Sequence, residues 1–488
     1  MKHAILIMAH KDIGLLCHLM EYFQRDCDIF IHLDKKVGWG QDAIDSLKSY
    51  KQVKLVSTEY EVNWGGTSVL ESELALLQTA YEYAAYDYFH LISGQDYPVK
   101  PLSYFLDFFE RNNGKNFLQW INIPSSRWER NTYRRFQYFY PYDMAQGREN
   151  PRAWVREQVA IQMEKGIKRP IPDEFDRLYG SSQWFSIMQD AAKSLLEYTR
   201  NHPEFYNRLW MTFAPEECYV ATVLLNKLDQ SNINQGNCRF IRWRYENGNR
   251  PANLGIEHFR YLLGDGLLFA RKIERHCSMD LQKLLDDYLV YFESKVSVTD
   301  TGGWIYDGYL AYEYDHQFCG QVIRLCSDLS IKNAVDIGCG PGYYVSMWRE
   351  HGLSFAGYDA NPHTIKLSER LLPDGDTPCG IADITGNLTG ADAFELVVCN
   401  SVLPYIPQSK LDKAISNLAS LSTAHILIGN HASGIQEPLS AQEVDEERLI
   451  GKFQEKGFLL NKFLSSAFQR AMGRKYYYIF TKYNCQTI

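Results

Sequence analysis

The stretch VDIGCGPGYYVSMW, residues 335–348, decides how this chain is divided. Residues 335–337 read as the end of an apolar strand, the glycines as a tight turn, and the remainder as the start of a helix. A strand, a glycine-rich turn and a helix are the usual opening of a nucleotide-binding α/β domain. Because this opening lies about two-thirds of the way along the 488 residues, we expect a separate domain before it.

The turn has the spacing G-x-G-x-G, formed by Gly338, Gly340 and Gly342, and not the G-x-G-x-x-G of dinucleotide-binding folds. Asp359 ends the next predicted strand, residues 355–359. A carboxylate at that place can accept hydrogen bonds from both ribose hydroxyls of a bound nucleoside. The glycines and Asp359 together therefore predict a nucleoside site.

Two later segments fit the same ligand. Asp383, in GIADI, stands where a third strand would end and can contact an adenine amine, and residues 394–407 read as a fourth strand followed by a loop. The series resembles the class I S-adenosylmethionine-dependent methyltransferases over about residues 306–488, with GFLLNKFLSS and KYYYIFTKY similar to their closing antiparallel strands. The resemblance implies a Rossmann-like domain that binds S-adenosylmethionine. An NAD-type Rossmann domain or a degenerate methyltransferase is the alternative.

Methyl transfer to an oxygen requires a group that removes the acceptor proton. His431, in GNHASG, is our candidate, with His316 and Tyr405 as alternatives, and a purely structural role is open for each. The aromatic segment WIYDGYLAYEYDHQF resembles the lid over the cofactor in many members of this family. That resemblance assigns ligand contacts to Tyr306 and Tyr314.

The overall composition, 45% hydrophobic and 23% charged, is that of a globular protein. A formal net charge of −8 and a pI of about 5.9 argue against broad nucleic-acid binding. The eleven cysteines are scattered without metal-type spacing, as in a reduced cytosolic protein. Neither a signal-peptide pattern nor a run of ~18 apolar residues is present. We therefore expect a cytoplasmic protein without a transmembrane segment.

The first part of the chain alternates short apolar runs with amphipathic stretches, which predicts parallel βαβ units. The runs are residues 4–9, 28–33, 53–56 and 88–93, and the helices include 14–24, 68–84 and 280–296. Residues 115–150, rich in Arg, Tyr and Asn, look irregular. The polar, glycine-bearing residues after 296 read as a linker. We expect domains at 1–296 and 306–488, joined by a linker at 297–305.

Five segments of the first domain, taken in order, carry a second resemblance. They are IHLDKK (31–36), NWGGTSVLESELALL (63–77), HLISGQDYPVK (90–100), APEECYVATVL (214–224) and RWRYENGNR…LLFARKI (242–273). Together they look like the Core 2/I-branching N-acetylglucosaminyltransferase and peptide O-xylosyltransferase family over about residues 4–275. The resemblance implies a GT-A-like fold, a UDP-sugar donor and inversion at the anomeric carbon.

An inverting transfer needs a carboxylate that removes the proton of the acceptor hydroxyl. In APEECYVATVL, Pro215 precedes a helix whose first turn holds Glu216 and Glu217. Acidic residues in a first turn are also common as partners of the helix dipole. In the family the second acid of this motif is the base, so the resemblance implies Glu217.

The UDP that departs carries two phosphate charges. Many GT-A enzymes balance them with a divalent ion held by Asp-x-Asp, but the corresponding strand end here reads SGQD. The family instead uses a basic pair near the end of the domain, and Arg250 and Lys272 match those positions, with Arg271 as a neighbouring decoy. We therefore expect a transferase that needs no metal.

Three residues stand where a nucleotide sugar would lie. His10 and Asp34 follow the first two strands, and Asp96 lies near the sugar-nucleotide centre. Asp34 could equally cap the loop that follows it, and Asp96 could be a turn residue before Pro98.

Acceptor binding calls for aromatic platforms and polar side chains. Trp243 and Tyr245 match a family pair that touches the acceptor sugar, and Trp184 belongs to GSSQWF, which resembles the strand beside the site. Arg130 and Arg134 reach acceptor or phosphate, or form exposed salt bridges.

Two cofactor-site patterns on one chain suggest a bifunctional bacterial enzyme of polysaccharide biosynthesis. The first domain would transfer a sugar, GlcNAc or xylose, from a UDP-sugar, and the second would methylate a glycan hydroxyl. The acceptor would be a glycan, free or lipid-linked at the cytoplasmic face of the membrane. The alternatives are a glycosyltransferase whose second domain only binds S-adenosylmethionine or docks, and a scaffold with two inactive sites.

Overall fold

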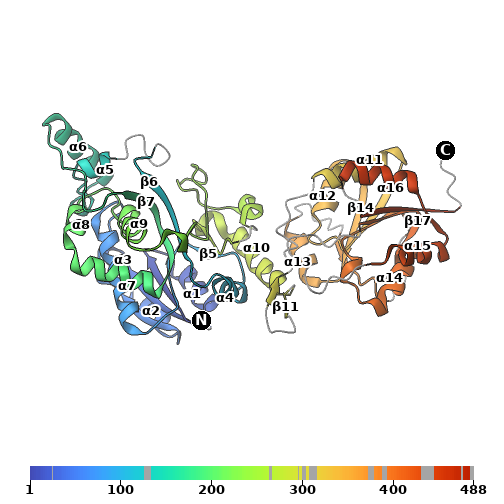
Figure 1. Ribbon diagram of the computed structural model, residues 1–488, viewed down its shortest axis with the longest axis horizontal. Coiled ribbons are helices and arrows are strands. Elements are labelled where there is room, and N and C mark those ends of the chain that lie inside the picture. The colour runs from blue at the N-terminus through green and yellow to red at the C-terminus, as the bar shows by residue number, and fades with distance from the viewer. Residues whose placement is uncertain are drawn as a thin grey trace. The chain divides into compact units, whose positions relative to one another are not determined.

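The computed structural model describes residues 1–24, 26–125, 133–262, 266–294, 296–298, 304–306, 316–371, 379–386, 393–429, 444–473 and 476–483. Contacts divide the chain into two compact units (Figure 1), one of residues 1–262 with 266–279 and one of 280–488 with 263–265. Among the described helices, none has the length and apolar character needed to cross a membrane.

The first unit is built on a seven-stranded sheet in the order β3-β2-β1-β4-β7-β6-β8. The first four strands of this order are parallel, β7 is antiparallel to its neighbours β4 and β6, and β8 is parallel to β6. The strands are β1 (His3–Ala9), β2 (Cys27–Leu33), β3 (Val53–Ser57), β4 (Tyr88–Ser93), β6 (Asn116–Ile123), β7 (Leu178–Met188) and β8 (Ile233–Gln235).

Helices cover this sheet, and every residue of β1 and of β4 is buried. Continuous apolar runs such as AILIMA are expected for parallel strands covered on both faces. The helices are α1 (Ile13–Tyr22), η1 (Lys35–Val37), α2 (Gln41–Lys48), α3 (Thr67–Tyr83), α4 (Leu102–Arg111), α5 (Arg134–Gln137), η2 (Tyr142–Met144), α6 (Pro151–Glu164), α7 (Gln189–Asn201), α8 (Pro203–Arg208), α9 (Glu216–Lys227), η3 (Gln230–Asn232) and η4 (Ile256–Leu262).

A small second sheet of the first unit has the order β5-β10-β9, with β5 (Tyr97–Pro98), β9 (Arg239–Ile241) and β10 (Phe269–Arg271). Its β10 is antiparallel to β5 and parallel to β9. This arrangement brings the segment after SGQD beside the FARKI segment, although the two are far apart in the chain.

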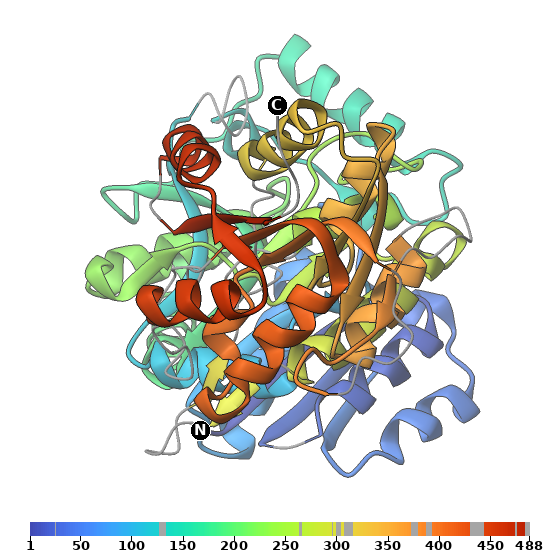
Figure 2. The same cartoon turned by 90° about the vertical axis from the view of Figure 1, so that its right-hand side faces the viewer.

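The second unit contains a seven-stranded sheet in the order β15-β14-β13-β16-β17-β19-β18, whose last pairings, through β19, are antiparallel. One helical layer, with α14 and α15, covers one face, and α11, α12 and α16 cover the other (Figure 1). Turned by 90°, the sheet is seen to cross between these two layers (Figure 2). This confirms the Rossmann-like fold and the closing antiparallel strands.

The elements of this part of the chain are α10 (Arg275–Ser294), β11 (Val296–Val298), β12 (Trp304–Tyr306), α11 (His316–Asp328), β13 (Asn333–Ile337), α12 (Tyr343–Glu350), β14 (Ser354–Asp359), α13 (Pro362–Leu371), β15 (Cys379–Ile381), β16 (Phe394–Asn400), η5 (Leu403–Tyr405), α14 (Gln408–Leu421), β17 (Ser422–Gly429), α15 (Glu446–Glu455), β18 (Phe458–Leu460), α16 (Lys462–Met472) and β19 (Tyr477–Lys482). The antiparallel pair β11 and β12 falls partly within the residues predicted to be a linker.

One expectation was wrong: residues 115–150 are not irregular throughout. They include β6, which pairs with β7 on one side and β8 on the other. The strand was missed because the polar residues Asn116, Gln119 and Asn122 interrupt its apolar pattern, while its stability comes from pairing with distant strands.

Candidate active site

Three segments meet beyond the ends of β1, β4 and β10, and Glu274 joins them. Its carboxylate forms an ion pair with Lys11 and accepts a hydrogen bond from Gln95 Nε2 at 2.5 Å. The backbone N–H of Ile273 donates to the carbonyl oxygen of Gln95 at 3.0 Å. The segments HKD, SGQD and ARKIE, which are remote in sequence, therefore line one place.

Lys272 lies in this group and is surrounded mainly by other cations. Burial, and then the charges of Arg271, Lys11 and Arg152, together lower its pKa to about 8, against the opposing effect of Glu274. An ammonium group held among like charges is stabilised by any anion that binds beside it. This is the electrostatic environment expected for a diphosphate site.

Arg250, the other predicted member of the basic pair, is exposed on a neighbouring segment. That segment runs beside Lys272, because Lys272 N–H donates to Ala252 O at 3.4 Å and Leu254 N–H donates to Lys272 O at 2.8 Å. Ala252, which makes one of these backbone contacts with Lys272, is only two residues after Arg250 in the sequence.

Arg271 is the last residue of β10, and its side chain is buried. Its guanidinium lies 4.0 Å from the centre of the Trp184 ring, and its Nε is 3.5 Å from Asp96 Oδ1. A second arginine, Arg239, has its Nε 3.6 Å from Asp96 Oδ2. Asp96 is fully buried between the two arginines, and Trp184 is buried beneath one of them.

His10 and Asp34 both lie beyond the ends of the first strands. Asp34 Oδ1 accepts hydrogen bonds from the backbone N–H groups of Lys36 and Val62, each at 3.1 Å, so Asp34 caps the loop that follows it. Desolvation, and then the charge of Lys11, lowers the pKa of His10, whereas Asp34 raises it. His10 therefore lies within electrostatic reach of Asp34 and of the lysines.

Glu217 is the second residue of α9 and has a side chain that is 29% exposed. Its Oε2 accepts a hydrogen bond from Arg135 Nη1 at 3.2 Å, and its backbone oxygen accepts one from Ser181 Oγ at 3.2 Å. Arg135 is buried and also lies over the ring of Phe213, at 5.3 Å. These contacts hold the Glu217 carboxylate in one orientation while leaving part of it open.

Glu216, its neighbour, is buried and belongs to a group of carboxyls. Burial, and then the charge of Glu217, raises the pKa of Glu216 to about 8. Glu73, fully buried on α3, has a pKa well above its usual range because of burial and the charge of Glu216. The protonated form is therefore favoured at Glu216 at neutral pH, and burial shifts the pKa of Glu73 in the same direction.

The protonation of Glu216 predicts a pH-dependent stability. Its pKa is about 8 in the folded chain against 4.5 in the unfolded chain, so the folded state binds the additional proton between these values. Stability must then fall as pH rises from about 5 to 8, by on the order of 3 kcal/mol. Glu216→Gln, which keeps the shape of the protonated acid, should remove much of this fall in chemical denaturation monitored at pH 5.5 and 8. Equal pH slopes for both proteins would contradict the assignment.

The WGG motif, which sequence alone did not explain, makes room for a capping carboxylate. Asp143 Oδ2 accepts a hydrogen bond from Thr67 N–H at 2.7 Å, at the start of α3, and Oδ1 accepts one from Ser68 Oγ at 2.5 Å. A Cβ on Gly66 would overlap Asp143 Oδ1, so glycine is needed there. The two glycines and Asp143 fix the N-terminus of α3, and Trp64, the first residue of the motif, lies three residues before this helix.

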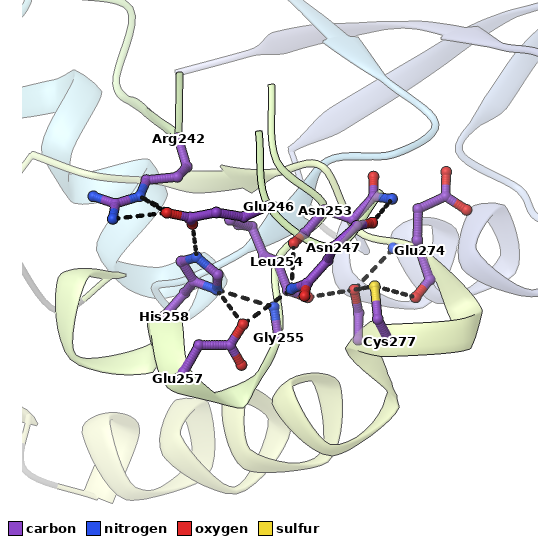
Figure 3. Close-up of polar contacts among 11 residues, drawn as sticks. Arg242, Glu246, Asn247, Asn253, Leu254, Gly255, Glu257, His258, Glu274 and Cys277 are labelled. Atoms are coloured by element: carbon purple, nitrogen blue, oxygen red, sulfur yellow. Dashed lines mark hydrogen bonds and ion pairs between the residues drawn. The ribbon is translucent and has the colours of Figure 1, made fainter. Parts of the chain in front are cut away.

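The loop of residues 242–258 is held by its own polar contacts (Figure 3). Arg242 Nη2 donates to Glu246 Oε1 at 3.0 Å, and His258 Nε2 lies 2.9 Å from Glu246 Oε2. The hydrogen bond from Arg242, and then that from His258, lowers the pKa of Glu246 to about 2. Asn247 and Asn253 each donate to the other's backbone oxygen at 2.9 Å. An ordered loop of this kind can present side chains to an acceptor.

The predicted acceptor residues on this loop are indeed at the surface. Trp243 is 53% exposed and Tyr245 is 73% exposed. Arg134 is exposed on α5, where its Nη2 lies 3.3 Å from Met163 Sδ, and Arg130 lies outside the described residues. Among the residues that the structure describes, no three His, Cys, Asp or Glu side chains form a metal-type group.

In the second unit, the glycine turn and Asp359 lie together as expected. Gly338, Gly340 and Gly342 have φ values of 78°, 57° and 81°, a region that favours glycine. Gly340 N–H donates to Asp359 Oδ2 at 3.1 Å, and Asn361 N–H donates to Asp359 Oδ1 at 2.8 Å. Each oxygen keeps a second lone pair for a ribose hydroxyl, so the residues present fit a nucleoside.

Asp383 lies two residues beyond β15 and is exposed; its Oδ1 accepts a hydrogen bond from Thr385 N–H at 2.8 Å. Asp336 on β13 was not predicted, and burial, followed by the charges of Cys379 and Asp359, raises its pKa to about 8. Tyr405 is half-buried in η5, and His316 begins α11. His431 and Tyr314 lie outside the described residues, and Tyr306 ends β12.

The geometry of the first unit agrees with the comparison to known families. Residues 4–262, more than half of the chain, match the Core-2/I-Branching enzyme family. The chain belongs to the Core-2/I-branching enzyme family.

Curated relatives of this Core-2/I-branching protein include animal xylosyltransferases. Xylosyltransferase sqv-6 of Caenorhabditis briggsae is 25% identical over 233 residues, covering 46% of this chain and 26% of the relative. Xylosyltransferase 2 of Homo sapiens is 24% identical over 280 residues, covering 53% of this chain and 30% of the relative. The chain thus spans less than a third of the length of either relative.

Residues 335–424 match a methyltransferase domain family. Solved structures that resemble this part include magnesium protoporphyrin IX methyltransferase from Synechocystis PCC 6803 with bound SAM, at 19% identity and a TM-score of 0.27, covering 34% of this chain and 79% of that one. The sugar N-methyltransferase KedS8 from Streptoalloteichus sp is 14% identical with a TM-score of 0.28, covering 36% of this chain and 90% of that one. The family match over residues 335–424 indicates that a methyltransferase-like domain follows the Core-2/I-branching domain.

Sequence reasoning missed Arg135, Arg239 and Asp143, which contact Glu217, Asp96 and the start of α3. The only signal for Arg135 was the arginine-rich segment TYRRF, and it could not distinguish Arg134 from Arg135. In α5 the first is exposed and the second is buried against α9.

Proposed function

We propose that this Core-2/I-branching protein is a bifunctional glycan-modifying enzyme. Its first domain, residues 1–296, transfers GlcNAc or xylose from a UDP-sugar to a glycan hydroxyl with inversion and without a metal. Its second, residues 306–488 after a linker at 297–305, methylates a glycan hydroxyl with S-adenosylmethionine. The observation that carries the first activity is the half-open Glu217 carboxylate oriented by Arg135.

In the glycosyl transfer, Glu217 removes the proton of the acceptor hydroxyl as that oxygen attacks the anomeric carbon. The bond from the anomeric carbon to the diphosphate breaks, and Lys272 offsets the charge that develops on UDP. His10, Asp34 and Asp96 support the nucleotide side, Asp96 by fixing Arg271 and Arg239. Trp243, Tyr245, Trp184, Arg130 and Arg134 are assigned to the acceptor side, Trp184 through its contact with Arg271.

In the methyl transfer, S-adenosylmethionine supplies an activated methyl group. Gly338, Gly340 and Gly342 would bring backbone N–H groups to the cofactor, and Asp359 and Asp383 would bind its ribose and adenine. His431 is the proposed base. The wider setting, a bacterial polysaccharide pathway with a free or lipid-linked acceptor at the cytoplasmic face, stays a prediction.

Incubation of the full chain with UDP-xylose, UDP-GlcNAc or UDP-GlcA, with S-adenosylmethionine and a panel of glycans, tests the proposal directly. We expect a product heavier by one sugar and, with S-adenosylmethionine, by a further methyl group in mass spectrometry. If neither UDP nor S-adenosylmethionine raises the melting temperature, the proposal fails.

Asp359→Ala should weaken S-adenosylmethionine binding about 10- to 100-fold in calorimetry, because it removes the ribose acceptor and the partner of Gly340 N–H. Glycosyl transfer should be unchanged. Asp328→Ala, at an exposed carboxylate that ends α11, is the matched control and should bind normally. Loss of methylation with normal cofactor affinity would contradict this role for Asp359. A wild-type protein that binds the cofactor but never methylates would favour the alternative in which the second domain is a binding module.

A further inference from the structure

We propose that Trp64 and Arg152 form an acceptor subsite for an anionic sugar, one whose ring carries a carboxylate or a phosphate. The inference rests on the proposed glycosyltransferase and names the class of acceptor that it would take. Arg152 is also one of the cations whose charges lower the pKa of Lys272, so the subsite lies within electrostatic reach of the proposed diphosphate site.

Trp64 is a large apolar surface left open to solvent. It is 57% exposed, and the guanidinium of Arg152 lies over its ring at 4.2 Å from the centre. Tyr142 and Phe213 contact Trp64 at 5.7 and 5.4 Å between ring centres, both near perpendicular, which fixes the indole. An indole held rigidly with a planar cation beside it suits a sugar ring that bears an anionic group.

Arg152 belongs to a row of arginines that have no acidic partner. Arg148 lies three residues before α6, and Arg152 and Arg156 follow it at intervals of four residues within the first two turns of the helix. All three are exposed. None of the carboxylates that the structure describes lies within 4.0 Å of them. Arg148 instead stacks on Trp154 at 3.8 Å. Aromatic rings, and not carboxylates, therefore orient Arg148 and Arg152.

This arrangement is unfavourable for the helix alone. Like charges four residues apart repel each other, and cations near a helix N-terminus oppose its dipole. The first turn of α6 contains no acidic residue to offset them. An anion bound beside Arg152 would interact favourably with both the arginines and the dipole.

The subsite adjoins the proposed base. The backbone N–H of Ala214 donates to the carbonyl oxygen of Gly65 at 3.0 Å, and Ala214 leads through Pro215 directly to Glu216 and Glu217. Trp64 is therefore one residue from a backbone contact with the segment that holds the base. A sugar next to the attacked hydroxyl could reach it, which favours the acceptor over the donor.

The test compares acceptors with and without the anionic group, using the donor that the full chain accepts. A disaccharide ending in a uronic acid, the same disaccharide with a sugar phosphate, and its neutral counterpart are measured for KM and for binding by calorimetry. We expect one of the anionic acceptors to bind about tenfold more tightly than the neutral one. Whichever of the uronic acid and the sugar phosphate binds more tightly shows which anionic group the subsite prefers. The preference should weaken as salt is added.

Arg152→Gln should abolish this preference and leave the KM for the neutral acceptor within a few-fold of wild type. Because Arg152 also lies within electrostatic reach of Lys272, UDP affinity is measured alongside and should fall less than the affinity for the anionic acceptor. Arg152→Lys should restore part of it, because the charge returns without the planar fork. Arg200→Gln, an exposed arginine on α7, is the matched control and should behave as wild type.

Equal affinity for neutral and anionic acceptors would overturn the inference, as would an acidic peptide without sugar that binds as tightly. A loss of UDP affinity in Arg152→Gln as large as the loss of affinity for the anionic acceptor would also overturn it and assign the arginine to the donor diphosphate. These results differ from failure of the proposed function, in which the wild-type protein would neither bind UDP nor hydrolyse a UDP-sugar.

Discussion

Glu217→Gln is expected to lower kcat for glycosyl transfer by about 10²- to 10⁴-fold, the usual contribution of a general base. The amide keeps the size of the side chain and can still face Arg135, but it cannot accept the acceptor proton. UDP affinity should be unchanged, because Glu217 is assigned to the acceptor hydroxyl and not to the nucleotide. Initial rates with saturating donor, together with calorimetry of UDP, measure both quantities.

Glu216→Gln is the matched control for this variant. It lies one residue away in the same helical turn, and its carboxyl is buried and protonated at neutral pH, so the amide changes little. Its kcat should stay within a few-fold of wild type. A large loss in Glu216→Gln with an active Glu217→Gln would show that the two acids have been assigned in the wrong order.

Lys272→Met is expected to lower kcat/KM by about 10²- to 10³-fold, because it removes the cation that offsets charge on the departing UDP. The pKa of Lys272, lowered to about 8 by burial and by neighbouring cations, adds a pH signature. The lysine is charged below this value, so wild-type kcat/KM should fall as pH rises through about 8. Lys272→Arg should retain activity at higher pH, since its guanidinium stays charged.

Arg250→Met provides the comparison, because it removes an exposed cation of the same loop region. A loss as large as that of Lys272→Met would support the basic pair implied by the family resemblance, and a small loss would assign the charge balance to Lys272 and its nearer neighbours. EDTA should not change the rate. Strict dependence on added Mn²⁺ would contradict a diphosphate site made of side-chain cations.

Much of the architecture could be predicted because it depends on local patterns. The apolar runs of β1 and β4 and the amphipathic pattern of α3 are each visible within a few residues. The closely spaced glycines after β13 indicate a turn with positive φ values, which other residues rarely adopt. β6 could not be predicted in this way, because pairing with distant strands outweighs its polar residues. The family resemblance assigned functional roles to individual residues, which the periodicity of the sequence alone does not indicate.

For the candidate site, too, the sequence predicted some features, and only the folded structure determined the others. The residue types were visible in the sequence: Glu216 and Glu217 at a helix start, a cationic segment at 271–272, and Asp359 after a strand. Their partners were not. Arg135 contacts Glu217 from 82 positions away, and α5 turns it inward while Arg134 stays outside.

Local residue order was therefore enough to identify two α/β domains, their order and their family resemblances, and to name candidate acids and cations, because strand, helix and turn signals act over short distances. Tertiary packing alone decided that Arg271 supports Asp96 and Trp184 while Lys272 lies among Lys11, Arg152 and Glu274. It also placed Asp143 against Gly66 and left Trp64 exposed beneath Arg152. The physical reason is that the charge, burial and orientation of a side chain depend on neighbours that folding brings from remote parts of the chain.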